Sequence, residues 1–126
     1  MPAPDDETPL FDPTAIDKLR KVAGDQGQTF VVEMAQLFID ETTKSLSEIR
    51  AGCERGDWKV VTRHAHSLKS SAATMGLMRL SSASRALEFQ AKSAVRTTET
   101  DGLVAAVLSD FEQAIPILKG LSQPPP

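Results

Sequence analysis

The segment from Thr62 to Gly76 holds the side chains best suited to chemistry. Its apolar residues recur at steps of three and four, which predicts a helix with one buried stripe. At about 100° per residue, His66 should project roughly 130° away from the centre of that stripe, towards solvent or a neighbouring protein. The side chains that share its face, by their spacing, are Thr62, Arg63, Lys69, Ser70 and Ala73.

This face has the composition of a docking surface for a phosphoryl group. A free imidazole is largely neutral near pH 7, so one ring nitrogen of His66 keeps a lone pair for attack on phosphorus. Lys69, assisted by Arg63 or Lys59, would offset the charge that arrives with the phosphate. The small residues on the same face leave the ring accessible from outside.

A carboxylate is expected at the height of His66 on the next helix. His66 lies ten residues before Gly76, and Glu88 lies twelve residues after it. If the chain reverses at Gly76, both lie roughly 15–18 Å from the turn on antiparallel neighbours, at about 1.5 Å per residue. Glu88 directly follows the core residue Leu87, so we expect it at the edge of the groove between the helices. There its carboxylate would orient the imidazole or hold Lys69.

The rest of the chain predicts the helices that position these residues. A polar stretch from Thr97 to Gly102 should separate the last two helices, and Pro116 should kink or shorten the final one. Four long amphipathic helices with short connections predict an all-α, antiparallel up-down-up-down four-helix bundle with a short extra N-terminal helix. The expected helices are a short one that begins at Asp12-Pro13, a long one over about 28–54, and three more over 58–75, about 78–94 and 103–118.

Length and composition restrict the class of protein. The 126 residues suffice for one ordinary domain. We expect it over residues 11–121, between a disordered acidic and proline-containing leader, 1–10, and a disordered proline-rich tail, 122–126. The net charge of −3 argues against a nucleic-acid ligand. Cys53 is the sole cysteine, which fits a reducing compartment, and no apolar run forms a signal peptide or membrane span. A cytoplasmic protein is therefore expected.

At these residues the chain resembles the histidine-containing phosphotransfer (HPt) domain of bacterial two-component phosphorelays. The resemblance extends from about Phe11 to Leu121. The stretches that carry it are Ala65-His66-Ser67-Leu68-Lys69-Ser70, Gly76, Leu87-Glu88, the Leu37-Phe38 pair and the Gly56-Asp57 turn.

The resemblance implies that His66 is the phosphoacceptor and that Lys69 lies beside the phosphate. It further implies that Ser70 and Ala73 keep the surface open, that Gly76 closes the helix, and that Glu88 supports the ring. Ser70 stands where many members have Gly, and Glu88 where some have Gln. A carboxylate at Glu88 would repel phosphate unless it were paired with Lys69.

The family implies a carrier rather than an enzyme, and the sequence agrees with that assignment. A monomer is expected. Phosphoryl transfer needs a metal to absorb charge, yet the sequence offers neither a phosphate loop nor a carboxylate cluster beside His66. The expected partner is a response-regulator receiver domain or a hybrid sensor histidine kinase, and the receiver would bring its own Mg²⁺. Docking is expected to involve Thr62, Lys59 and Phe11.

Two other functions compete with the phosphoryl carrier. A non-phosphorylatable four-helix adaptor would bind receiver domains without accepting phosphate. An enzyme that used His66 as a general base would need a convergent second group and a pocket, and the sequence identifies neither.

His64, about 200° around the helix from His66, cannot share a metal with it and is expected to be structural.

Overall fold

Every element of the computed structural model, which describes residues 8–121, is helical. The predicted all-α class is confirmed. The elements are α1 (Pro13–Ala23), the 3-10 turn η1 (Gly24–Gln26), α2 (Gly27–Arg55), α3 (Trp58–Thr74), α4 (Met78–Ala91) and α5 (Thr98–Gly120).

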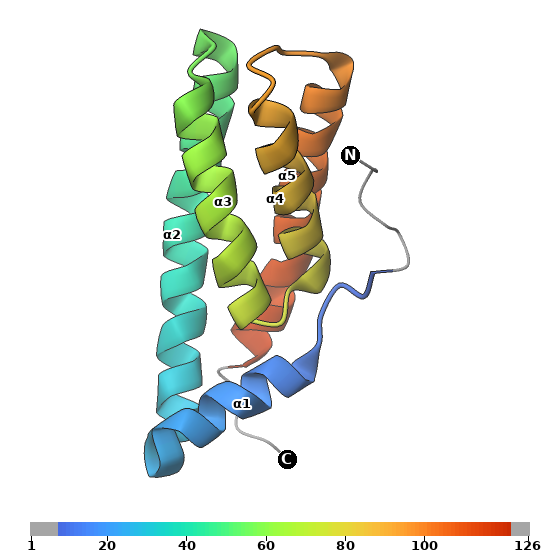
Figure 1. The fold of residues 1–126 in the computed structure, drawn as a ribbon. Helices are drawn as coiled ribbons and strands as arrows, with labels where there is room; N and C mark the ends of the chain where they lie inside the picture. The colour runs from blue at the N-terminus through green and yellow to red at the C-terminus, as the bar shows by residue number, and fades with distance from the viewer. Residues whose placement is uncertain (1–7, 122–126) are drawn as a thin grey trace.

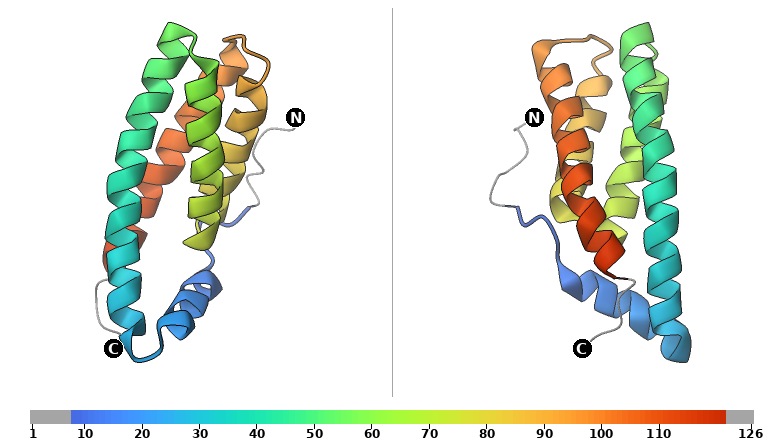
Figure 2. Two further views of the ribbon diagram at one scale, coloured as in Figure 1. Left: turned by 60° about the vertical axis from the view of Figure 1, so that its left-hand side comes forward. Right: turned by 180° about the vertical axis from the view of Figure 1, so that it is seen from behind.

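The four helices α2 to α5 run up and down side by side and form the predicted antiparallel bundle (Figure 1). Short connections impose this arrangement, because a helix that follows a tight turn must lie against its predecessor. Seen from behind, α5 packs beside α2 and closes the ring of four (Figure 2). The short helix α1 lies across the end of the bundle at which α2 begins and α3 ends.

The apolar stripes of the four long helices meet in one core. Ile49 of α2, Val61 and Leu68 of α3, Leu87 of α4 and Val107 of α5 are each at most 3% exposed. Each such side chain stabilises the fold by roughly 1.5–3 kcal/mol relative to an exposed position. The core therefore fixes how far each helix rotates, and with it the direction in which its polar side chains point.

Local signals set both ends of α3. Gly56, at φ 72°, ends α2 in the left-handed conformation that glycine adopts without strain. The side chain of Asp57 then accepts a hydrogen bond from the backbone N–H of Val60 at 3.3 Å and caps the start of α3. At the other end Gly76, at φ 77°, reverses the chain into α4.

Two boundaries differ from the sequence prediction. The polar stretch from Thr97 to Gly102 is mostly helical, because Thr97 and Thr100 form a capping box that starts α5 at Thr98. The fourth helix ends at Ala91 instead of Ala94, and Ala94 itself has a positive φ of 58°.

The last helix is not shortened by its proline. Pro116 lies inside α5, which continues as far as Gly120.

No helix among residues 8–121 has both the length and the apolar character needed to cross a membrane.

The chain before α1 is tied to the α3–α4 turn. Arg79 donates a hydrogen bond from Nε to the carbonyl of Thr8 at 3.0 Å, and the N–H of Asp12 donates to the carbonyl of Gly76 at 2.7 Å. Phe11 is half-buried against the core. Of the stretches expected to be disordered, residues 1–7 and 122–126 lie outside the described residues.

Candidate functional site

His66 lies at the middle of α3 with its ring towards solvent. Its side chain is 61% exposed, whereas Ala65 and Leu68 on the same helix are buried in the core. The contrast follows from the helical period, since the core stripe takes the positions at i−1 and i+2 and leaves His66 outside it. The predicted exposure of this imidazole is confirmed.

Glu88 of α4 lies opposite His66 and contacts two side chains of α3 at once. Its Oε2 is 2.6 Å from Nδ1 of His66, and its Oε1 accepts a hydrogen bond from Nζ of Lys69 at 2.8 Å. Its own side chain is only 10% exposed. The sequence predicted Glu88 at this height, in contact with either the ring of His66 or Lys69. The carboxylate contacts both.

The carboxylate determines which ring nitrogen of His66 carries the proton. An ionised carboxylate is only a hydrogen-bond acceptor, so the contact with Glu88 requires an N–H at Nδ1. In the neutral ring the lone pair then lies on Nε2. The site therefore presents an exposed imidazole whose unprotonated nitrogen, in the neutral ring, is Nε2.

Glu88 stays ionised in spite of its burial. Burial alone would raise the pKa of this carboxyl group, but the hydrogen bonds from Lys69 and His66, together with their charges, outweigh it and lower the pKa below the ordinary value. Near pH 7 the carboxylate is thus a permanent anion beneath the ring.

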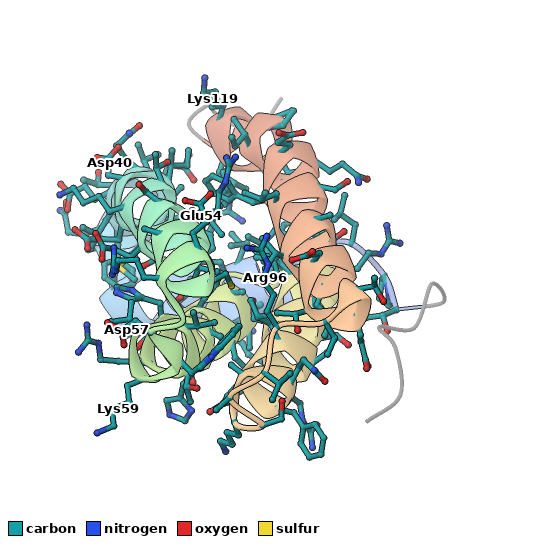
Figure 3. All side chains as sticks on the ribbon, turned by 90° about the horizontal axis from the view of Figure 1, so that it is seen from above. Asp40, Glu54, Asp57, Lys59, Arg96 and Lys119 are labelled. Atoms are coloured by element: carbon teal, nitrogen blue, oxygen red, sulfur yellow. The ribbon has the colours of Figure 1, made fainter. Side chains whose placement is uncertain are left out.

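A groove of about 480 Å³ runs between α3 and α4 from His66 towards the start of α3. Lys59, Arg63 and Lys92 line it, are exposed, and make no ion pair with any of residues 8–121. Seen from the end of the bundle, Lys59 extends outward from α3 (Figure 3). These cations concentrate positive charge along the groove, although the chain as a whole carries a net charge of −3.

The structure brings most of the sequence-predicted site residues together. Arg63, Thr62 and Lys59 line the groove with His66, and Lys69 reaches it through Glu88. Ser70 and Ala73 are exposed on the continuation of the same helix.

Two of the predicted site residues lie away from the groove. Gly76 lies at the α3–α4 turn, where an added Cβ would collide with the backbone oxygen of Asp12 and meet the Cβ of Ala15 at 3.1 Å. Its close neighbour is therefore the entry to α1. Phe11 packs against the core just before α1 and does not line the groove.

Sequence reasoning did not assign five of the residues that line the groove, which are Lys92, Trp58, Ser67, Ala91 and Ala94. Lys92 lies four residues after Glu88, hence on the same face of the helix, and that spacing was the available signal. Trp58 was expected only as a packing residue, but it is half-buried and forms part of the groove wall. Ser67 adds a hydroxyl beside His66.

Comparisons with known proteins agree with this arrangement. The profile of the Hpt domain family matches residues 33–115 of the chain. In fold the chain is similar to histidine-containing phosphotransfer protein B (HptB) from Pseudomonas aeruginosa PAO1, with a TM-score of 0.80 and 21% sequence identity over 91% of this chain and 96% of that one. It is also similar to a rice protein described as a candidate histidine-containing phosphotransfer protein, with a TM-score of 0.76 and 22% identity over 89% of this chain and 80% of that one. A search of the curated proteins finds no match.

Proposed function

The chain belongs to the Hpt domain family, whose members are phosphocarriers in two-component phosphorelays and interact with receiver and kinase domains, and from that premise we propose that His66 is its phosphoacceptor. The ring would accept a phosphoryl group from the aspartate of one receiver domain and pass it to another. The chain would act as a carrier without an ATP site of its own.

One observation supports this proposal above the others. His66 is an exposed imidazole whose Nδ1 is held 2.6 Å from a buried carboxylate, so that Nε2 is free to attack. The other histidine, His64, is half-buried and pairs with a neutral hydroxyl instead, Oγ of Ser45 at 3.3 Å from its Nδ1.

The transfer step follows from this geometry. The lone pair on Nε2 attacks the phosphorus of an aspartyl phosphate as the bond from phosphorus to the aspartate oxygen breaks. The aspartate leaves as a carboxylate, and the phosphoryl group is then bonded to Nε2 while Nδ1 keeps its proton. Glu88 offsets the positive charge that develops on the ring during the attack.

The receiver would supply what this chain lacks. In this proposal its acidic pocket holds the Mg²⁺ that absorbs charge on the transferring group. The cations Lys59, Arg63 and Lys92 would attract that acidic rim and guide it to His66. Lys69 remains paired with Glu88, which removes the repulsion that an isolated anion would exert on the incoming phosphoryl group.

Transfer from a phosphorylated receiver domain tests the proposal. Radiolabelled receiver is mixed with the wild-type chain, with His66→Gln and with His64→Gln, and the protein-bound label is measured after acid and base treatment. We expect base-stable, acid-labile label on the wild-type chain and on His64→Gln, and none on His66→Gln. Label on His66→Gln at the wild-type level would refute the assignment. Binding of the receiver without any label would favour the adaptor instead.

A further inference from the structure

The partner of the His66 ring is an anion, and the fold fixes it in place. Glu88 as a whole residue is 7% exposed, and its Oε1 accepts a hydrogen bond from the ammonium group of Lys69 at 2.8 Å. The carboxylate therefore cannot turn away from the ring without breaking an ion pair in a site of restricted solvent access. An amide at this position would support the ring equally well but would carry no charge.

The charge matters most after phosphorylation. Once Nε2 carries a phosphoryl group, the remaining ring nitrogen either keeps its proton, as a phosphoimidazolium, or releases it to solvent. The protonated form loses the phosphoryl group easily, because neutral imidazole is the leaving group. The unprotonated form would have to expel an imidazolate anion, which is a far poorer leaving group.

We propose that Glu88 retains the proton on Nδ1 throughout the transfer cycle and so keeps the phosphorylated ring of His66 in its labile form. The inference rests on the proposed function, since it requires His66 to be the phosphoacceptor. It makes Glu88 a positioning residue with a second task, which is to make the phosphoryl group easy to release as well as easy to accept.

Other charges that face the ring act on the same proton. From α3 these are Lys69 and Arg63, with Lys59 further along the groove, and from α4 they are Glu88 and Lys92. The cations disfavour a positive ring, whereas Glu88 and the phosphoryl group favour it. Of these protein groups only Glu88 is hydrogen-bonded to the ring, so it should have the largest influence.

The test measures how long the phosphoryl group stays on the ring as a function of pH. Wild-type chain and Glu88→Gln are loaded with potassium phosphoramidate, whose P–N bond breaks as the bond to Nε2 forms and ammonia leaves. The reagent is removed, and the hydrolysis of phosphohistidine is followed by ³¹P NMR. In hydrolysis water attacks phosphorus, the electrons of the P–N bond return to Nε2, and inorganic phosphate departs.

We expect the two proteins to lose phosphate at similar rates near pH 5, where both rings are protonated. At pH 9 the wild-type chain should hydrolyse about tenfold faster than Glu88→Gln, because an adjacent opposite charge shifts a protonation equilibrium by one pH unit or more. A purely structural role for Glu88 would change the rate by the same factor at every pH. Superimposable pH profiles, or profiles offset by a constant factor, would overturn the inference.

A second variant should shift the pH profile of hydrolysis in the opposite direction from Glu88→Gln. Lys92→Met removes a cation that lines the same groove but does not anchor Glu88, so the ring proton should be held more firmly and rapid hydrolysis should extend to higher pH. A shift to lower pH would contradict the proposal. Receiver-dependent labelling of His66→Gln distinguishes failure of the proposed function from failure of this inference. Receiver-derived label on His66→Gln at the wild-type level refutes both, whereas matched pH profiles with label that depends on His66 refute only the role of Glu88.

Discussion

Two helical hairpins share α3, and only one of them forms the site. In the α2–α3 hairpin, Nδ1 of His64 lies 3.3 Å from Oγ of Ser45, and the histidine is half-buried. In the α3–α4 hairpin, Nδ1 of His66 lies 2.6 Å from the carboxylate of Glu88, and its ring is exposed. Two histidines separated by one residue therefore differ both in accessibility and in the charge of the partner on Nδ1. The neighbouring helix therefore sets the surroundings of each ring.

The turns of the two hairpins differ in a parallel way. Gly56 and Gly76 both have left-handed backbone conformations, with φ of 72° and 77°. A Cβ at Gly56 would meet no atom within 4 Å, whereas one at Gly76 would run into the backbone of Asp12. The hairpin that carries the candidate site is therefore the one whose turn packs against the entry to α1.

Alanine at the two glycines should produce the largest effect on stability. Gly56→Ala should cost about 1 kcal/mol, the penalty of a side chain in the left-handed conformation. Gly76→Ala should cost about 3 kcal/mol, because the entry to α1 must also move to make room. Urea unfolding followed by circular dichroism measures both free energies. Equal losses in the free energy of unfolding would show that the entry to α1 does not restrict the conformation of the α3–α4 turn.

The comparison also shows how far the sequence determines the site. The register between His66 and Glu88 was predictable, because a glycine marks the turn and helices rise at a fixed rate per residue. The bounds of α2 and α3 were predictable to within about one residue for the same reason, since Gly56 and Asp57 mark the break between them.

What the sequence did not predict depends on contacts between elements. Phe11 was expected at the docking surface, yet the path of the chain before α1 places it against the core. The polar residues from Thr97 to Gly102 have the composition of a loop, and only the reciprocal hydrogen bonds of Thr97 and Thr100 turn them into a helix start. Lys92 joins the site because α4 packs against α3 with that face inward to the groove.

Charge reversal tests whether the groove between α3 and α4, rather than the surface of α2, guides the docking of a receiver domain. Arg63→Glu and Lys92→Glu should each slow phosphotransfer from a receiver domain by about tenfold at low salt, because they would repel the acidic rim that the proposal gives the partner. Lys44→Glu is the matched control on α2, outside the groove, where the lysine side chain is 77% exposed. Rapid-quench measurement of the transfer rate tests the prediction, and the difference should narrow as added salt screens the charges. An equal loss in Lys44→Glu would mean that net charge, and not the groove, governs association.

The smallest expected effects on stability come from replacing the partners of the two histidines, Glu88 and Ser45. The two replacements should differ in how their stability cost depends on pH. The pKa of Glu88 is lowered from 4.5 in the folded state. Its contribution to stability is therefore fully present above that value and is lost as the pH falls through the lower folded-state pKa. Glu88→Gln should destabilise the bundle by about 1 kcal/mol at pH 7, in keeping with a charged hydrogen bond replaced by neutral ones.

That destabilisation should shrink towards zero as the pH falls below the ordinary glutamate range, where the wild-type carboxyl is protonated as well. Ser45→Ala removes a neutral hydroxyl from His64, so its cost should stay below about 1 kcal/mol and should not follow the titration of any carboxyl group. Urea unfolding of both variants between pH 3 and pH 7 gives the two curves. A constant cost for Glu88→Gln across this range would mean that the carboxylate and its two α3 partners add nothing through charge, and the distinction between the two hairpins would then rest on exposure alone.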